Sequence, residues 1–414
     1  MPTSDPPLAP SPSGANLAEA SARLTALQKS FSQAHFEDVL QALEPLLEEL
    51  RFRHPDSAEL HRLRVRGLLL RMRSLSKFDR LEDILHSGAE ALELLSGHGP
   101  TVERAEVFVF QAFAYNLLAW PQPALSATHL ALQDALALGS TELSAQAMER
   151  AAMCYLSMGD GLLAERFMLE AIGFAEQCTA SAAKQLRYSN ALHLACVLFD
   201  AYQDCGEPDA ARQLLPRFGR VQAQGEHHMA ALAHSCYIDA IWHGNQARWL
   251  RRAGQTERAG QLLREVLALA LARDWQGLIR PMRLELGLEL QAAGQHAQAL
   301  QELQRVFEPV ELPLREFQAV RCLQAMALSQ QALGQDAQAE QTQATLALRL
   351  QGQRERVLAA QRRLAGLDQR MMDMLQAADR ARIEQELQNM GQRAQQGRAV
   401  RVPGMDWPPV ALSA

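Results

Sequence analysis

Three similar segments between residues 247 and 350 constrain the fold of this chain more than any other feature. Their glycines, Gly254, Gly294 and Gly334, are 40 residues apart. Each glycine is followed five residues later by an alanine, namely Ala259, Ala299 and Ala339. A period of this length is typical of stacked supersecondary units, none of which can bury its apolar face alone. We therefore expect an extended array of repeated units.

The composition indicates that these units are helical. β-Branched residues are sparse, whereas Ala, Leu, Gln, Glu and Arg dominate, and these are good helix formers. Pro281 and Pro313 stand where the first helix of a unit should begin, a position that favours proline. Ser140 precedes a helical pattern and is expected to be its N-cap.

The turn signature recurs with decreasing clarity toward the N-terminus. Gly159 and Gly206 each have a tyrosine four residues before them and an alanine five residues after. Ala119 takes the place of the glycine in a third match, and weaker matches come near Ala34 and Ser74. The sequence therefore predicts about eight units whose turns are 40 to 48 residues apart.

This pattern resembles the tetratricopeptide repeat, in which the first helix carries a small and a large apolar residue. A glycine at the turn and an alanine on the second helix complete the pattern. Glycine adopts the left-handed conformation at a helix end, and alanine allows the two helices to approach closely. The resemblance covers about residues 20–350 and implies an all-α, right-handed superhelical solenoid. The period exceeds the ~34 residues of the simplest members, which makes it similar to the longer repeats of bacterial regulators such as the maltose-regulon activator.

An apolar stripe with a seven-residue period follows the repeats. It contains Leu350, Val357, Leu364, Leu367, Met371 and Met374. A cap that folds back on the last repeat would explain part of the stripe, whereas a coiled coil explains its whole length. We favour a homodimer whose seam these residues form. The predicted organisation is a disordered tail over 1–16, a solenoid over 17–345, a long coiled-coil-like helix over 346–398 and a flexible Pro-rich tail over 399–414.

Charge and cysteine usage narrow the function classes. The net charge of −6 and a pI near 6.1 argue against a general nucleic-acid or membrane binder. The six cysteines have no C-x-x-C spacing and lie within helical patterns, as expected for reduced thiols. The N-terminal residues lack the pattern of a signal peptide, and no run of 18 apolar residues is present. We expect a cytoplasmic protein.

Motifs for catalysis are missing from the sequence. It contains neither a phosphate-binding loop nor the common nucleophile and zinc-protease motifs. His227, His228, His234 and His243 form the densest histidine group, but spacings of seven residues are not the usual i, i+4 of helical zinc ligands. We therefore expect no enzyme, no catalytic residue, no metal and no cofactor.

The resemblance also implies where a partner binds. In such repeats the first helices line the concave groove, and the positions two, three, six and ten residues before the turn face the ligand. Carried onto this sequence, these positions give Asn116, Glu149, Asp200, Gln203, Asp204, Arg248, Arg251 and Arg252. The early part of this groove would be acidic and the later part basic.

Two functions follow as expectations. The first is a non-catalytic scaffold or signalling adaptor that binds a protein or peptide in the concave groove. It would be similar to the repeat region of bacterial diguanylate cyclases, without their catalytic domain. The alternative is a ligand-sensing module of a transcriptional or cyclic-dinucleotide signalling system.

Overall fold

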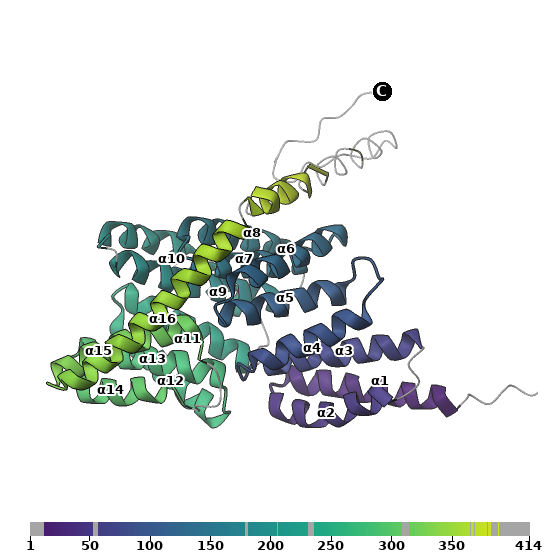
Figure 1. The fold of residues 1–414 in the computed structure, drawn as a ribbon, viewed down its shortest axis with the longest axis horizontal. Helices are drawn as coiled ribbons and strands as arrows, with labels where there is room; N and C mark the ends of the chain where they lie inside the picture. The colour runs from purple at the N-terminus through teal and green to yellow at the C-terminus, as the bar shows by residue number, and fades with distance from the viewer. Residues whose placement is uncertain are drawn as a thin grey trace, which may run out of the picture. The chain divides into compact units, whose positions relative to one another are not determined.

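A computed structural model describes residues 12–52, 57–178, 181–204, 206–230, 236–308, 314–364, 366–367, 369–378, 380–381 and 388. Within these residues the regular structure is α-helical, with no strand. The chain divides into two compact units, residues 1–363 and 364–414. The sixteen helices whose bounds are given below all belong to the first unit (Figure 1).

The helices of the first unit form eight consecutive pairs. They are α1 (Pro12–Ser32) and α2 (Phe36–Phe52), α3 (Ala58–Leu75) and α4 (Leu81–Leu94), α5 (Val102–Leu117) and α6 (Pro121–Ala137), α7 (Thr141–Ser157) and α8 (Gly161–Gln177), α9 (Ser181–Asp204) and α10 (Pro208–Ala230), α11 (Cys236–Arg252) and α12 (Thr256–Ala272), α13 (Gln276–Ala292) and α14 (His296–Arg305), and α15 (Glu316–Ala332) and α16 (Asp336–Arg363). Consecutive helices pack against each other, and α10 contacts α11 through the rings of Phe218 and Trp249, whose centroids are 6.1 Å apart. The predicted all-α solenoid is confirmed.

The turn inside each pair contains one residue with a left-handed backbone. These residues are Ala34 (φ 64°), Asp79 (55°), Ala119 (57°), Gly159 (83°), Gly206 (75°), Gly254 (80°), Gly294 (75°) and Gly334 (71°). Glycine adopts this conformation without strain, whereas other residues adopt it rarely. The alanines predicted to follow the turns at five residues are buried between the helices of their pairs. The glycine and alanine signature therefore locates the repeats correctly.

Two details of the predicted pairs are wrong. Ser74 is not a turn residue but is buried in α3, and the turn lies five residues later at Asp79. Pro281 does not begin α13, which starts at Gln276. Burial explains the earlier start, because Trp275 is buried directly before the helix and its first turn is buried as well. Pro313 lies outside the described residues, and Ser140 is the predicted N-cap of α7, its hydroxyl accepting from the Leu143 amide at 3.3 Å.

The C-terminal stripe does not lie along one uninterrupted helix. Helix α16 ends at Arg363, and helical residues resume at Leu367 after Gly366, whose φ is +76°. A left-handed residue cannot continue an α-helix, so the single helix predicted over 346–398 is wrong at this point. The homodimer seam stays a prediction. Of its residues, Leu350 is 37% exposed, and Leu364 and the residues after it belong to the second unit.

Helix α16 also reaches well beyond its own repeat. Gln353 donates to the backbone carbonyl of Ser157 at 3.3 Å, and Arg363 donates to Gln122 at 3.0 Å. The second half of α16 thus contacts the third and fourth helical pairs (Figure 1).

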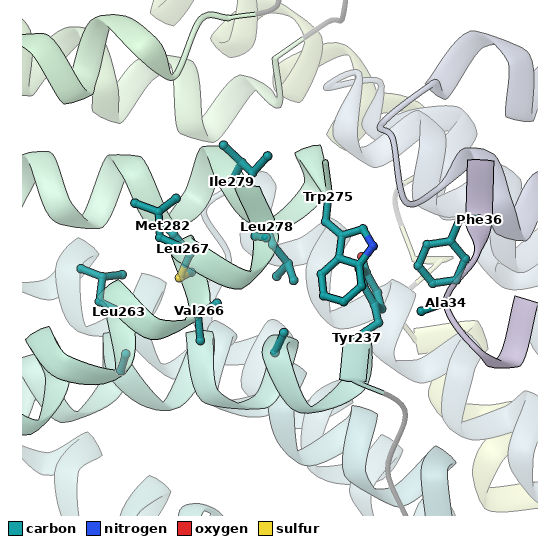
Figure 2. Packing of buried hydrophobic residues seen from close by; sticks show 13 residues of the cluster. Ala34, Phe36, Tyr237, Leu263, Val266, Leu267, Trp275, Leu278, Ile279 and Met282 are labelled. Atoms are coloured by element: carbon teal, nitrogen blue, oxygen red, sulfur yellow. The ribbon is translucent and has the colours of Figure 1, made fainter. Parts of the chain in front are cut away.

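The two N-terminal turns contact repeats far away in the sequence. Phe36 packs edge-on against Tyr237, with ring centroids 5.0 Å apart, and Tyr237 in turn packs against Trp275 at 4.9 Å (Figure 2). Arg315, before α15, donates to both carboxylate oxygens of Asp79 at 2.9 and 3.2 Å. The beginning of the array is therefore joined to the starts of α11, α13 and α15.

The repeat geometry makes a prediction for Gly294. Because its φ is +75°, we expect Gly294→Val to lower the free energy of unfolding by about 1 to 2 kcal/mol through backbone strain. Urea unfolding followed by circular dichroism measures this. Gly173→Val is the matched control, because Gly173 has an ordinary helical φ and open space around its α-carbon. Equal stability of the two variants would contradict the role of the turn.

Candidate functional site: a cationic cavity inside the solenoid

A cavity of about 580 Å³ lies inside the array. Its walls are formed largely by the first helices of successive pairs, from α3 to α15. Many lining residues are three or four positions apart within a helix, as Glu142, Gln146 and Arg150 of α7 illustrate. This spacing places side chains on one helical face. The concave face of the solenoid therefore becomes the wall of a pocket.

The described lining of the cavity is rich in cations. It contains Arg73, Lys77, Arg150, Arg187, Arg248 and Arg315, against two lining carboxylates, Glu106 and Glu142. This excess contrasts with the net charge of −6 of the whole chain. Whether it attracts a ligand depends on how far other carboxylates neutralise it.

Two of these cations are balanced one to one. Arg73 donates its Nε to Glu106 at 2.9 Å, which joins α3 to α5. Arg315 is held by Asp79, whose side chain is almost fully buried. The Arg315–Asp79 pair is bidentate, which fixes the guanidinium group in place. Both pairs are therefore part of the wall and contribute little net charge.

A single carboxylate serves two other arginines. Glu149 lies 2.7 Å from Nη2 of Arg150 and also forms an ion pair with Arg187, and the charge of Glu142 also acts on Arg187. The Nε atoms of both arginines are buried without a hydrogen-bond partner. Burial lowers the pKa of Arg187, and the charge of Glu149 opposes this effect. Arg150 also lies over the ring of Phe113, 5.1 Å from its centroid.

Glu285 is the centre of a larger network. It accepts from Arg248 at 2.9 Å, from Arg251 at 2.5 Å and from Arg252 at 3.3 Å, and it is only 2% exposed. Burial alone would raise the pKa of Glu285, but Arg252, Arg251 and Arg248 together hold it well below its ordinary value. Glu285 therefore stays ionised and fixes the orientation of three arginines.

Asp200 and His193 complete this network. Asp200 pairs with Arg252 and, at 2.6 Å, with Arg321. The Nδ1 atom of His193 lies 2.5 Å from Nη1 of Arg248. Burial, followed by repulsion from Arg248 and other arginines, places the pKa of His193 well below its ordinary value. The imidazole is therefore neutral and accepts a hydrogen bond from Arg248.

Lys77 differs from the arginines around it. Within the described part of the chain, no carboxylate lies at ion-pair distance from its amine. Instead, the Lys77 amine is 4.9 Å from the ring centroid of Tyr237, 5.9 Å from Phe36 and 6.0 Å from Phe31. Burial and the charges of nearby arginines, Arg150 first, lower the pKa of Lys77 to about 8.

The groove residues predicted from the resemblance are distributed unequally. Arg248 lines the cavity, whereas Glu149, Asp200, Arg251 and Arg252 belong to the ion-pair networks of its wall. Asn116 accepts from Ser157 at 2.7 Å and joins α5 to α7, Gln203 is exposed near the end of α9, and the side chain of Asp204 lies outside the described part.

The lining positions explain this distribution. Lining residues are frequent about 6, 9, 13 and 16 residues before the turn, so they extend toward the beginning of the first helix. The positions two and three residues before the turn lie at the other end of that helix. Arg150, Arg187 and Arg315 were therefore missed. Lys77 does stand two residues before the turn residue Asp79, and it was missed because the sequence signature placed this turn near Ser74. One signal was available for Lys77, since it is one of only three lysines in the chain.

The described residues offer no alternative centre for metal or thiol chemistry. Among them no group of three or more His, Cys, Asp or Glu side chains could hold a metal ion. Of the predicted histidine group, the side chains of His228 and His234 lie outside the described part. Burial raises the pKa of Cys154 and of Cys322 to about 12, so both thiols stay protonated.

No helix in the described part of the chain combines the length and apolar character needed to cross a membrane.

Stacked helical pairs, left-handed turns and buried alanines define this chain as a tetratricopeptide-like repeat protein. No family model matches the chain, and no curated protein matches it significantly. Among solved structures it is similar to a Rap protein complexed with Competence and Sporulation Factor. The identity is 13% and the TM-score 0.52, and the match covers 82% of this chain and 99% of that chain. The likeness at this identity concerns the fold.

Proposed function

We propose that the chain is a non-catalytic scaffold that binds an acidic peptide, or an acidic segment of a partner protein, inside the central cavity. The unbalanced positive charge of the cavity wall carries this proposal. Like charges gathered in a partly buried site repel one another, and an arriving carboxylate relieves that repulsion. Cationic side chains without enough carboxylates therefore favour an anionic ligand.

The size and lining of the cavity fit this proposal. Its volume of about 580 Å³ is within the range of sites for small ligands. Phe110, Phe113 and Ile241 supply apolar wall between the charged groups, which suits the mixed surface of a peptide. The similar Rap protein was solved as a complex with Competence and Sporulation Factor, which supports a binding function for this type of array.

A ligand-sensing regulatory role is the second candidate. The observation that favours it is the contact of the N-terminal turns with the starts of α11, α13 and α15, close to the cavity. A ligand in the cavity contacts residues of both parts, such as Lys77 and Asn245, and stabilises the arrangement in which they meet. In this role the chain would be a regulatory module that reports the presence of its ligand.

The first test is selection from a library of random short peptides by the immobilised full chain. We expect enrichment of Asp and Glu, with affinity falling as salt rises. The control for each selected peptide is the same sequence with Asn and Gln in place of Asp and Glu. Those amides should bind at least ~10-fold more weakly. Selection of neutral or basic peptides would reject the proposed function.

A further inference from the structure

We propose that Lys77 binds a carboxylate of the ligand directly, and that the Arg150–Glu149–Arg187 group binds a second carboxylate. This inference rests on the proposed function and specifies its ligand as a segment with two separate carboxylates. Two points of the cavity offer cationic groups to a ligand. One is Lys77, and the other is the pair of arginines that share Glu149.

The position of Lys77 is fixed before any ligand arrives. Its backbone carbonyl accepts from the Gly277 amide at 3.4 Å, which joins the α3–α4 turn to the start of α13. Asp79, two residues later, has a left-handed backbone and is held by Arg315. The turn is thus anchored at the lysine and again two residues after it. A lysine whose backbone is held in this way loses less freedom when its amine binds an anion.

The surroundings of Lys77 strengthen an ion pair with a ligand. Phe31, Phe36 and Tyr237 surround its amine, and aromatic side chains exclude water from it. Charges attract more strongly where water is excluded. The ring faces attract the ammonium group, but burial beside several arginines disfavours its charge, so a carboxylate that pairs with Lys77 removes an existing cost.

The charge distribution favours carboxylates over a phosphate. A phosphate is bound best by several donors at one point, most often arginine forks. Near Lys77, however, Arg73 already donates to Glu106 and Arg315 to Asp79. One amine remains there, which matches one carboxylate. The second positive charge comes from a different part of the wall, and its arginines have buried Nε atoms without hydrogen-bond partners.

The test uses full-length protein and dansylated tetraglutamate as the probe, with affinity measured by fluorescence. We expect Lys77→Met to bind at least ~10-fold more weakly than the wild type, because a partly buried ion pair is lost. Lys77→Arg keeps the charge and should recover most of the affinity. Lys29→Met removes an exposed lysine of α1 and should bind as the wild type does. Circular dichroism confirms that each variant is folded.

The alternative outcomes separate the inference from the proposed function. Equal binding of the probe by wild type and Lys77→Met rejects the lysine subsite and leaves the proposed function standing. Absence of binding to the wild type rejects both for this class of ligand. Dansylated tetraglutamine should not bind, and binding as tight as that of tetraglutamate would overturn the carboxylate assignment. Displacement of the probe by inorganic phosphate at lower concentration than by glutarate would assign the site to a phosphate ligand instead.

Discussion

Replacing Glu285 with glutamine is expected to lower the free energy of unfolding by about 3 to 5 kcal/mol. Glu285 is buried and accepts from three arginines, Arg248, Arg251 and Arg252. Glutamine preserves the size of the side chain but removes its charge. The arginines then remain close together without this counter-ion, and removal of one partner from a buried network is strongly destabilising.

Urea unfolding followed by tryptophan fluorescence measures this effect. Trp249 is buried in α11, and Trp275 is buried directly before α13, the helix that contains Glu285. Glu302→Gln is the matched control. Glu302 pairs with Arg305 on the surface of α14 at 2.6 Å, where the arginine is half exposed. Exposed pairs contribute about 0 to 1 kcal/mol. If the two variants lose similar stability, the Glu285 network is not a main support of the fold.

Lys77→Met is expected to stabilise the ligand-free protein by about 2 kcal/mol at pH 7. The pKa of Lys77 is lowered to about 8 by burial and by Arg150, Arg73 and Arg315, so the charged lysine is disfavoured in the folded state. One pKa unit corresponds to about 1.4 kcal/mol, and partial exposure of the side chain reduces the total. Methionine retains an apolar side chain against the aromatic rings and removes the charge.

The pH dependence of the stability difference between Lys77→Met and the wild type shows whether the charge of Lys77 causes it. The unfolded chain binds more protons at Lys77 than the folded chain between about pH 8 and pH 10.5. The charge of Lys77 therefore does not lower the free energy of unfolding of the wild type above pH 10.5. The loss of stability grows as pH falls from 10.5 and is complete once pH has fallen through 8. The advantage of Lys77→Met should be constant below pH 7 and shrink as pH rises toward 10. We would measure urea midpoints at several pH values, with Lys29→Met as control. An advantage independent of pH would exclude the charge as its origin.

These two expectations connect the site to its function. A lysine that weakens the folded state although its backbone is anchored is explained by binding, in which a ligand carboxylate offsets its cost. The glutamate has the opposite role, since it permits several arginines to remain close together. Loss of ligand affinity in Lys77→Met together with a gain in stability would separate a binding residue from a structural one.

The repeats could be predicted from the sequence because their turns require particular residues. Glycine marks a left-handed turn and alanine a close helix contact, so Gly294 and Ala299 identify a pair without any knowledge of its surroundings. The glycine signature did not locate the turn at Asp79, because a residue other than glycine adopts φ 55° there. There Asp79 pairs with Arg315, a contact that sequence spacing does not reveal.

The cavity could not be predicted in the same way. Its charge is a difference between cations and carboxylates contributed by different helices, and the sequence does not show which of them pair. Glu149 was predicted to face a ligand, but it neutralises part of the charge of Arg150 and Arg187. Lys77 precedes α4 rather than lying within a first helix. It is brought to the cavity by long-range packing.

The C-terminal stripe is a third feature that could be predicted from the sequence only in part. The seven-residue period predicted one continuous helix, and periodicity alone cannot detect the interruption at Gly366. A glycine within a helical pattern costs only ~1 kcal/mol, so its presence does not decide between continuation and a break. The contacts of Gln353 and Arg363 with earlier repeats determine the course of α16 up to its end.

The contact between Asp79 and Arg315 has a consequence for how the array gains and loses its structure. In a simple solenoid each repeat interacts with its neighbours alone, so terminal repeats can detach one after another. Here an ion pair and an aromatic cluster span more than 200 positions of the chain. Separation of the first two pairs therefore also breaks contacts of the sixth, seventh and eighth pairs. Such non-local pairing raises contact order, slows folding and merges the eight pairs into one cooperative transition.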